Sequence, residues 1–567
     1  MTARTPGDDP TRPTERLSAL ASALQAGDKA GAARLAEACL AEGIWAPLAL
    51  RTAALARASV GRFAEALELL RIGVRQAPGD AGAWSALAQG LRAARRIEAA
   101  LAAADRALDL APADPGLICA KAALLQELSR TEEAAVLFTQ ALSIDPNGIE
   151  ARLGLALQAI EAGDWDAAQA RIDGLDAGAR KSPDLSWLDA RIALGRGEPE
   201  RARTGFATLA SDVRLAPERR ANAFLLMGEA LDTLGLPAEA FHAAAEGKQL
   251  LRALFAQRAQ ERESEIAKLS RLRDWFAAAD PRPWQIAPAQ GPIPGQAASH
   301  TFLVGFPRSG TTLLEQVLAG HSGVESLEEA PTLSEAYAQF LSTAEGLQRL
   351  AGLSDDDAQA WRGRYWAEVA RHGVSTAGKL FLDKQPAGTL YLPLIAKLFP
   401  GAKILFAVRD PRDVTLSCLR NNFQINAMTY AFTSLPDTTA CYDACMGMAE
   451  VYRRTLPLTL IEVRHEQLVA DFDRELARIA AFLDLPIEPA MADVAATVRS
   501  RSVRTPSAGQ LRAGLNRSGF GRWRAYAAQM APVLPVLAPW VRRFGYPSDA
   551  AIPDPEQNGG GAEASPP

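Results

Sequence analysis

The stretch TFLVGFPRSGTT, residues 301–312, decides the fold of the second half of this 567-residue chain. Its first five residues are mostly apolar or β-branched and end in glycine, which predicts a short buried strand. Leu313, Leu314, Val317 and Leu318 follow with the apolar spacing of a helix. Strand, tight loop and helix in that order direct backbone N–H groups and the positive end of a helix dipole at one point. The stretch therefore predicts a binding site for an anion such as a phosphate.

The side chains of this loop favour an anion other than a nucleoside triphosphate. The spacing Gly305-x4-Gly310 copies the P-loop of nucleotide triphosphatases, but Thr311 stands where that loop needs lysine. Arg308 supplies a fixed positive charge instead, and hydroxyl groups can add donors. The alternative is a structural turn that binds nothing. The residues predicted to bind the anion are Pro307, Arg308, Ser309, Gly310, Thr311 and Thr312.

A second strand-to-helix junction carries a second arginine. Residues 403–408, KILFAV, predict a buried strand that runs directly into Arg409. Ser417 lies eight residues further on, in the predicted helix that follows. A guanidinium group at a strand end and a nearby hydroxyl suit a second phosphate, because arginine forms charge-assisted hydrogen bonds in a fixed geometry. The two junctions together predict a ligand with two separate anionic groups.

Composition excludes several classes of protein. The net charge of −5 argues against a general nucleic-acid or anionic-membrane surface, and no run of about 20 apolar residues could span a bilayer. The first residues lack the apolar stretch of a signal peptide, and five scattered cysteines are too few for a disulfide framework, so we expect a reduced, cytoplasmic protein. Abundant alanine and arginine indicate a GC-rich bacterial genome. The histidines and the pair Cys441-x3-Cys445 form no metal-binding spacing, so no metal is expected.

The first half of the chain repeats with a period of 34 residues. Alanine recurs at this interval and proline keeps the same phase, at Ala32, Ala66, Ala100, Ala134, Ala168 and Ala202 and at Pro78, Pro112 and Pro146. Small residues let helices approach closely and proline ends a helix, so the period predicts antiparallel helix pairs. Period and markers resemble the tetratricopeptide repeat, best over residues 81–114; the alternative is an unrelated alanine-rich helical domain. The resemblance implies an α-solenoid, a fold that mostly offers a surface to a partner.

Breaks in these patterns predict the domain boundaries. Residues 280–298 contain five prolines and separate the helical pattern from the strand-and-loop pattern. We expect disordered residues 1–14, a tetratricopeptide-type helical domain over 15–279, a proline-rich linker over 280–298, an α/β domain with a short parallel sheet over 299–548, and a disordered tail over 549–567. A chain that starts near Gly291 is therefore expected to form its own core.

The two junctions resemble the 5′-phosphosulfate loop and the 3′-phosphate site of sulfotransferases that use 3′-phosphoadenosine 5′-phosphosulfate (PAPS). The order of motifs is most similar to tyrosylprotein sulfotransferases and to bacterial sulfotransferases with an N-terminal tetratricopeptide array. The resemblance covers residues 301–546 and implies a P-loop-like sulfotransferase domain that needs no metal. It assigns the 3′-phosphate to Arg409 and Ser417, and further nucleotide contacts to His465, Ser507 and Arg522. His465 stands where the family usually has tyrosine.

The same resemblance implies catalytic roles for three residues. Glu329, the second of two adjacent glutamates, matches the base that takes the proton of the attacking hydroxyl. Lys384 would lie against the bridging oxygen and the 5′-phosphate of PAPS, and Arg308 would help to neutralise the transferred group. The alternatives are a solvated acidic loop for Glu329 and an ordinary surface position for Lys384.

These observations predict an enzyme that transfers a sulfuryl group from PAPS, its co-substrate, to an acceptor hydroxyl. The acceptor is open between a protein tyrosine, which the solenoid could present, and a glycan, lipid or small molecule. A partner-binding scaffold with an inactive nucleotide domain is the alternative from another class. The predicted site argues against a scaffold, because an inactive domain has no need of Arg308, Glu329, Lys384, Arg409 and Ser417 together. No nucleic-acid partner is expected.

Overall fold

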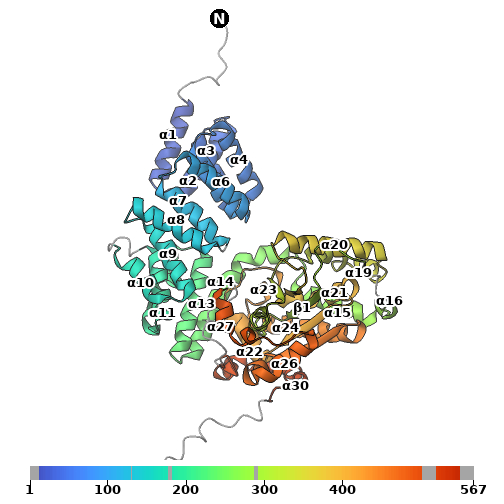
Figure 1. Ribbon diagram of the computed structural model, residues 1–567. Helices are drawn as coiled ribbons and strands as arrows, with labels where there is room; N and C mark the ends of the chain where they lie inside the picture. The colour runs from blue at the N-terminus through green and yellow to red at the C-terminus, as the bar shows by residue number, and fades with distance from the viewer. Residues whose placement is uncertain are drawn as a thin grey trace, which may run out of the picture. The chain divides into compact units, whose positions relative to one another are not determined.

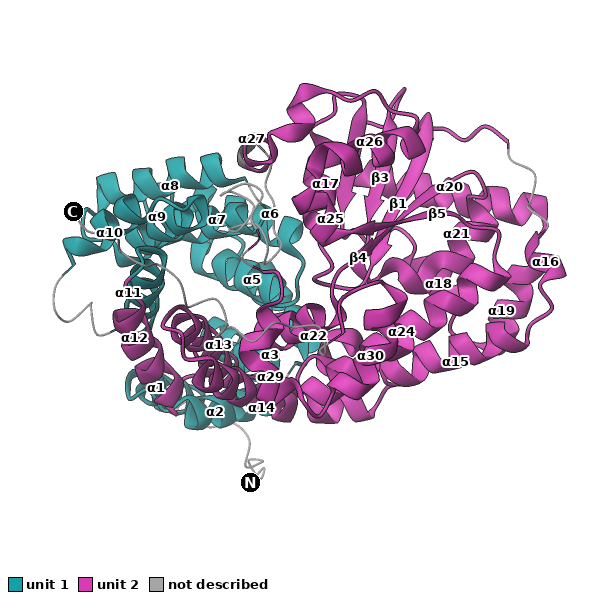
Figure 2. Ribbon diagram, turned by 90° about the horizontal axis from the view of Figure 1, so that it is seen from below, with its two compact units in different colours: residues 1–197 teal, residues 198–567 magenta. Residues whose placement is uncertain are grey.

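The computed structural model describes residues 12–59, 61–128, 130–175, 182–285, 291–500, 517 and 519–548. The chain divides into two compact units, residues 1–197 and 198–567, which Figure 2 shows in different colours. The helices of the described residues include none whose length and apolar content would let it cross a membrane.

Successive helices make up the first unit and appear in blue to cyan in Figure 1. The alanines that mark the 34-residue period are buried at the helix contacts, and the side chains of Asp80 and Asp114 accept hydrogen bonds from the first turns of the helices that follow them. The helices are α1 (Arg12–Gln25), α2 (Lys29–Ala41), α3 (Pro47–Ser59), α4 (Phe63–Gln76), α5 (Ala81–Ala93), α6 (Ile97–Leu110), α7 (Pro115–Glu127), α8 (Thr131–Ile144), α9 (Ile149–Ala162), α10 (Trp165–Asp173) and α11 (Pro183–Gly195).

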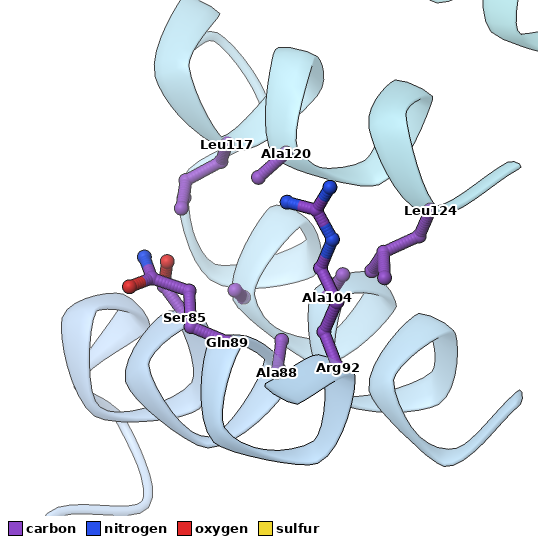
Figure 3. Close-up of a pocket in the computed structure, with 9 residues that line it drawn as sticks. Ser85, Ala88, Gln89, Arg92, Ala104, Leu117, Ala120 and Leu124 are labelled. Atoms are coloured by element: carbon purple, nitrogen blue, oxygen red, sulfur yellow. The ribbon is translucent and has the colours of Figure 1, made fainter. Parts of the chain in front are cut away.

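A small cavity lies within this unit between α5, α6 and α7. Its volume is about 40 Å³, and Figure 3 shows the Arg92 side chain extending from α5 towards α7 across it. Ligand pockets usually measure about 300–1,000 Å³, so this cavity has room for water and not for a nucleotide. Its lining is Ser85, Ala88, Gln89, Arg92, Ala104, Ala107, Leu117, Ala120 and Leu124.

The second unit begins with helices and continues into a sheet. Its first helices are α12 (Pro199–Ser211), α13 (Pro217–Thr233), α14 (Pro237–Gln260), α15 (Glu265–Ala278) and α16 (Arg282–Gln285). Leu269, Phe276 and Trp284 belong to the same hydrophobic core as the sheet residues Phe302 and Phe406. The division between the compact units lies at residue 197. We expected residues from Gly291 onwards to form their own core, but helices before the predicted linker supply part of that core. Proline content marks the end of a helix there, but Trp284 still packs into the core.

In the described residues, five strands form one parallel sheet in the order β2-β3-β1-β4-β5. The strands are β1 (Ser299–Gly305), β2 (Val324–Glu328), β3 (Leu380–Lys384), β4 (Lys403–Val408) and β5 (Thr459–Arg464). The strands predicted over 301–305 and 403–408 are β1 and β4, which pair directly with Thr301 opposite Lys403. An α-solenoid followed by an α/β domain with a short parallel sheet is thus confirmed as the fold.

Alternate residues of the central strand β1 face opposite sides of the sheet. Phe302 and Val304 join the core shared with α15, whereas Leu303 joins a second core with Leu314 and Val317 of α17. The helices described after β1 are α17 (Thr311–Ala319), α18 (Ser334–Phe340), α19 (Ala344–Ala351), α20 (Asp355–Arg371), η2 (Pro386–Tyr391), α21 (Leu392–Leu398), α22 (Pro411–Arg420), α23 (Ala427–Ala431), α24 (Leu435–Thr455), α25 (His465–Ala470), α26 (Phe472–Leu483), η3 (Pro489–Ala492), α27 (Val494–Ser500), η4 (Arg522–Tyr526), α29 (Ala527–Met530) and α30 (Leu534–Arg543).

Candidate active site

The loop between β1 and α17 lies at the carboxyl edge of the sheet, at its central strand. Gly310 is the N-cap of α17 with a φ of 93°, and a Cβ atom there would lie 2.5 Å from Nδ1 of His465. Only glycine fits this position, because the conformation is left-handed and the imidazole occupies the space of a side chain. Glycine also leaves the first N–H groups of α17 without a capping side chain, which is the arrangement that binds anions. Ser309, Thr311 and Thr312 are buried beside it.

Two predicted site residues hold a backbone conformation that side chains disfavour. Arg308 has a φ of 71° and Glu329 a φ of 50°. Among the described residues other than glycine, Arg95 and Asp484 are the further cases of positive φ. Such strain persists where the surrounding structure enforces it, and it is common at functional sites. The loop backbone therefore supports a functional interpretation of both positions.

The two predicted anion sites contact each other through their arginines: Arg308 reaches the serine of the second site, and Arg409 reaches the loop of the first. Arg308 donates from Nε to Oγ of Ser417 at 2.9 Å, and Arg409 donates from Nη1 to the carbonyl oxygen of Arg308 at 3.5 Å. Arg409 also donates to the carbonyl oxygen of Gly519 at 2.6 Å, while its Nε atom is buried without a hydrogen-bond partner in the described part of the chain. Burial, together with the charge of Arg409, lowers the pKa of Arg308 to about 10. An anion placed here would accept a hydrogen bond from Arg409 Nε and would stabilise the charge on Arg308, which raises its pKa.

His465 joins this group from the end of β5. Burial lowers the pKa of its imidazole to about 3, with smaller contributions from Arg409 and Arg308, so the ring is neutral at physiological pH. Its Nδ1 atom is buried, faces Gly310 and has no hydrogen-bond partner among the described residues. The ring of Phe520 lies edge-on at 5.6 Å. The structure thus brings His465 to the predicted site despite its substitution for tyrosine.

A second cluster lies on the other side of β1, at the ends of β2 and β3. Lys384 Nζ is fully buried and donates to Glu328 at 2.8 Å and to Glu329 at 2.9 Å, with Glu315 at 3.6 Å. Burial disfavours the charge on Lys384, but the three carboxylates outweigh it and raise the pKa. Lys384 is therefore not an ordinary surface lysine. The Glu329 side chain is 49% exposed, so its carboxylate is held by the lysine and still open to a reactant.

Glu315 was missed by the sequence analysis. It lies on α17, is buried, and accepts a hydrogen bond at 3.1 Å from the hydroxyl group of Ser326 on β2. The available signal was a carboxylate inside the apolar helix pattern of residues 313–318, where a charge needs a partner. Its partner, Lys384, comes from β3, which the local pattern could not reveal.

Other predicted residues have different surroundings. Arg522 pairs with Asp232 of α13 and its side chain is 40% exposed, while Ser507 lies outside the described residues. The carbonyl oxygen of Pro307 accepts a weak hydrogen bond from the Cys418 thiol. His321 accepts a backbone hydrogen bond from Gly323, which is a structural role. The described residues contain no group of three or more histidine, cysteine or acidic side chains that could hold a metal ion.

Comparison with known proteins supports these local resemblances. Residues 301–489 match the sulfotransferase family, and residues 125–192 match a tetratricopeptide-repeat family. An uncharacterised protein of Aquifex aeolicus is 26% identical over 43% of this chain and 33% of that protein, so the match spans a third of its length. A putative protein-tyrosine sulfotransferase of Caenorhabditis briggsae is 24% identical over 45% of this chain and 91% of that protein.

Two further comparisons cover the same part of the chain. Protein-tyrosine sulfotransferase 1 of Danio rerio is 25% identical over 45% of this chain and 75% of that protein. The match to the sulfotransferase domain of the Synechococcus PCC 7002 olefin synthase covers 46% of this chain and all of that domain, with 23% identity and a TM-score of 0.30. The family matches and the relatives' names together show that this chain combines a sulfotransferase-family domain with tetratricopeptide repeats.

Proposed function

We propose that the protein is a PAPS-dependent sulfotransferase that transfers a sulfuryl group to an acceptor hydroxyl. The observation that carries the proposal is the convergence of Arg308, Arg409 and Ser417 at a glycine-capped helix start that has no P-loop lysine. Two guanidinium groups from separate strand ends suit a nucleotide with two separate anionic groups. The match of residues 301–489 to the sulfotransferase family supports the same reaction class.

The donor set fits PAPS in three respects. The N–H groups of the loop and of the start of α17 would bind the 5′-phosphosulfate, and Arg409 with Ser417 would bind the 3′-phosphate. The buried Nε of Arg409 and the buried Nδ1 of His465 have no partners in the described residues, so a ligand group could use them without breaking an existing bond. Arg522 would have to leave Asp232 before it could reach the nucleotide.

The reaction follows from the charges of the two clusters. PAPS supplies the sulfuryl group and leaves as 3′-phosphoadenosine 5′-phosphate (PAP). Glu329 would accept the proton of the acceptor hydroxyl on its half-exposed carboxylate. Lys384 orients that carboxylate through a hydrogen bond of 2.9 Å, and its ammonium group would oppose the charge that develops on the departing phosphate. Arg308, fixed by Ser417, would neutralise the group in transfer.

Nucleotide binding tests the donor assignment. Calorimetry without Mg²⁺ should give an affinity for PAP about 10- to 100-fold higher than for 5′-AMP, because one charge-assisted contact contributes roughly 1.5–3 kcal/mol. Equal affinities, or tight Mg²⁺-dependent binding of ATP, would refute the donor assignment.

Paired glutamine variants test the base. Glu329→Gln should lower kcat by roughly 100-fold while the affinity for PAP stays close to that of the wild type. Glu328→Gln is the matched control, since Glu328 contacts the same Lys384 Nζ atom but its side chain is only 22% exposed. The control should lose much less activity. Near-normal turnover of Glu329→Gln would move the role of base to another residue.

The acceptor that we propose is a tyrosine of a peptide or protein. The support is the similarity of the sulfotransferase-family domain to proteins named protein-tyrosine sulfotransferases, together with repeats of a kind that commonly bind proteins. Transfer of labelled sulfate from PAPS to a tyrosine peptide library, measured beside a panel of glycans, lipids and phenols, tests it. Labelling confined to the non-peptide panel would overturn this acceptor class and leave sulfuryl transfer itself intact.

A further inference from the structure

The helix pair α13–α14 belongs to the same core as the sheet. Leu231 of α13 and Ala240 and Ala243 of α14 pack in the cluster that contains Phe302 and Phe406 of the central strands. Residues of this pair also reach α22 and the segment that follows it. Asn222 accepts a hydrogen bond from Asn422, and Asp232 pairs with Arg420 at the end of α22. The pair is therefore packed against the element that carries Ser417.

Lys248 of α14 makes a further connection to the end of α22. Its side chain is fully buried, and Nζ donates to the carbonyl oxygen of Asn421 at 2.7 Å while lying 5.5 Å from the ring centre of Phe423. Asn421 is the C-cap residue of α22. A buried ammonium group is costly, and lysine is rarely buried without a specific partner. Here the partner is the backbone at the end of the helix that carries a predicted phosphate ligand.

Hydrogen bonds continue from Asn421 into the predicted donor site. The Asn421 side chain donates from Nδ2 to the carbonyl oxygen of Ser417 at 2.8 Å and to its Oγ at 3.3 Å. The same Oγ accepts the hydrogen bond from Arg308 Nε at 2.9 Å. One unbroken series of contacts thus runs from Lys248 through Asn421 and Ser417 to Arg308.

We propose that Lys248 is a positioning residue for the 3′-phosphate site, acting through Asn421 on Ser417, so that helix α14 forms part of the donor-binding machinery. This inference rests on the proposed function. Lys248 holds the backbone carbonyl group of Asn421 in place. This contact sets the direction of the Asn421 side-chain amide, which in turn orients the Ser417 hydroxyl group. Without the ammonium group, that carbonyl oxygen loses its donor and the end of α22 rearranges.

The test measures selectivity for the 3′-phosphate on the full-length chain. The readout is the ratio of the dissociation constants of 5′-AMP and PAP, measured by calorimetry beside the melting temperature. Lys248→Met keeps the length of the side chain and removes the ammonium group. It should weaken PAP binding about tenfold and leave AMP binding nearly unchanged, so that the ratio falls about tenfold. A merely structural role would lower the melting temperature and leave the ratio unchanged.

A matched control lies one turn further along the same helix. Arg252 is also a cation of α14, and it donates to Asp437 and Thr433, at the start of α24, instead of to the end of α22. Arg252→Met should lower the melting temperature without changing the ratio. Asn421→Ala provides an independent variant at a half-buried position, which keeps the test open if Lys248→Met does not fold. It should also lower the ratio.

The outcomes separate this inference from the proposed function. A wild-type protein that binds PAP no better than AMP would refute the donor assignment and the role of Lys248 with it. A wild-type protein that prefers PAP, with Lys248→Met or Asn421→Ala equally selective, would refute the role of Lys248 alone. A fall in the ratio for Arg252→Met as large as for Lys248→Met would also refute it, because any loss of charge on α14 would then have the same effect.

Discussion

Helix pairs α5–α6 and α13–α14 are built alike, with small residues between antiparallel helices, but their cations have opposite surroundings. Arg92 of α5 is half-exposed and pairs with Glu127 beside a small cavity. Lys248 of α14 is fully buried and bound to the end of α22. An exposed ion pair contributes little to stability, whereas a buried charge constrains whatever surrounds it. The same helical pattern can therefore carry an exposed ion pair in one place and a buried cation in another.

The carboxylates that take part in ion pairs at these two places differ in the same way. Asp232 of α13 is nearly buried and accepts hydrogen bonds from three residues that lie far along the chain, Arg420, Arg522 and Tyr526. Glu127 of α7 meets the single arginine Arg92 at the surface of the first unit. The carboxylate of α13 therefore has three partners from distant parts of the chain, whereas the carboxylate of α7 has one from a neighbouring helix.

Two truncations should give the largest contrast. A chain starting at Glu198 keeps α13–α16 and is expected to fold and to bind PAP nearly as the full chain does. A chain starting at Gly291 loses Leu269, Phe276 and Trp284 from the core and is expected not to fold, since each deleted core side chain alone would cost roughly 2–5 kcal/mol. Circular dichroism and PAP calorimetry on both would check this. Native-like PAP binding by the shorter chain would show that α13–α16 are not needed for the core around the sheet.

Loss of the Asp232 charge should have the second-largest effect on stability. Asp232→Asn leaves the guanidinium of Arg420, whose side chain is 14% exposed, without its carboxylate, and should lower the free energy of unfolding by about 3–5 kcal/mol. Glu127→Gln is the matched control in an exposed pair and should change it by less than about 1 kcal/mol. Chemical denaturation measures both. Equal losses of unfolding free energy in Asp232→Asn and Glu127→Gln would show that the buried ion pair contributes no more to stability than the exposed one.

Lys248 should make stability depend on alkaline pH. Burial lowers its pKa from 10.5 to about 8, so the folded state releases the proton at lower pH than the unfolded chain. The stability contributed by this group is present above pH 10.5 and is lost as the pH falls through 8, a change of the order of 3 kcal/mol. Cys418 of α22 is the titratable group that faces it, and burial raises the pKa of that thiol to about 12.

Denaturation of the wild type and of Lys248→Met between pH 7 and 10.5 measures this effect. The wild type should gain stability relative to the variant as the pH rises from 7 to 10.5, because only the wild type carries the ammonium group that burial disfavours. A constant difference across this range would indicate that Lys248 keeps its proton in the folded protein.

Arg92→Ala should have the smallest effect. The residue is half-exposed, so we expect a change of less than about 1 kcal/mol in stability and no change in PAP affinity. A loss of acceptor turnover at constant PAP affinity would instead implicate the α5–α7 surface in acceptor binding. Steady-state kinetics with the acceptor found in the transfer assay decides between these outcomes.

Local patterns predicted the parts of the fold and site that short segments determine. The strand before Gly305, the loop around Arg308 and the junction at Arg409 each depend on a few neighbouring residues, and the structure brings the two arginines together because parallel strands share a carboxyl edge. His465 lies near the two arginines because it follows β5, another strand of the same parallel sheet. Proximity of these groups was predictable from topology alone.

Contacts between distant segments were not predictable. The burial of Lys384 depends on carboxylates from α17 and β2, and lysine is by default a surface residue. Arg522 was predicted at the nucleotide but pairs with Asp232, which lies 290 residues earlier in the chain. Proline content suggested a boundary at 280–298, but hydrophobic packing continues across it through Trp284.

The contact between Asp232 and Arg522 also bears on the order in which the protein is made and folds. A pairing over 290 residues can close only after residue 522 has left the ribosome, and such non-local contacts form slowly because a long loop must be closed first. Until then Asp232 of α13 lacks the hydrogen bond that Arg522 donates to it in the folded protein. A nascent chain should therefore expose the carboxylate of Asp232 until Arg522 has been made, and chaperone dependence during this part of translation is the expected consequence.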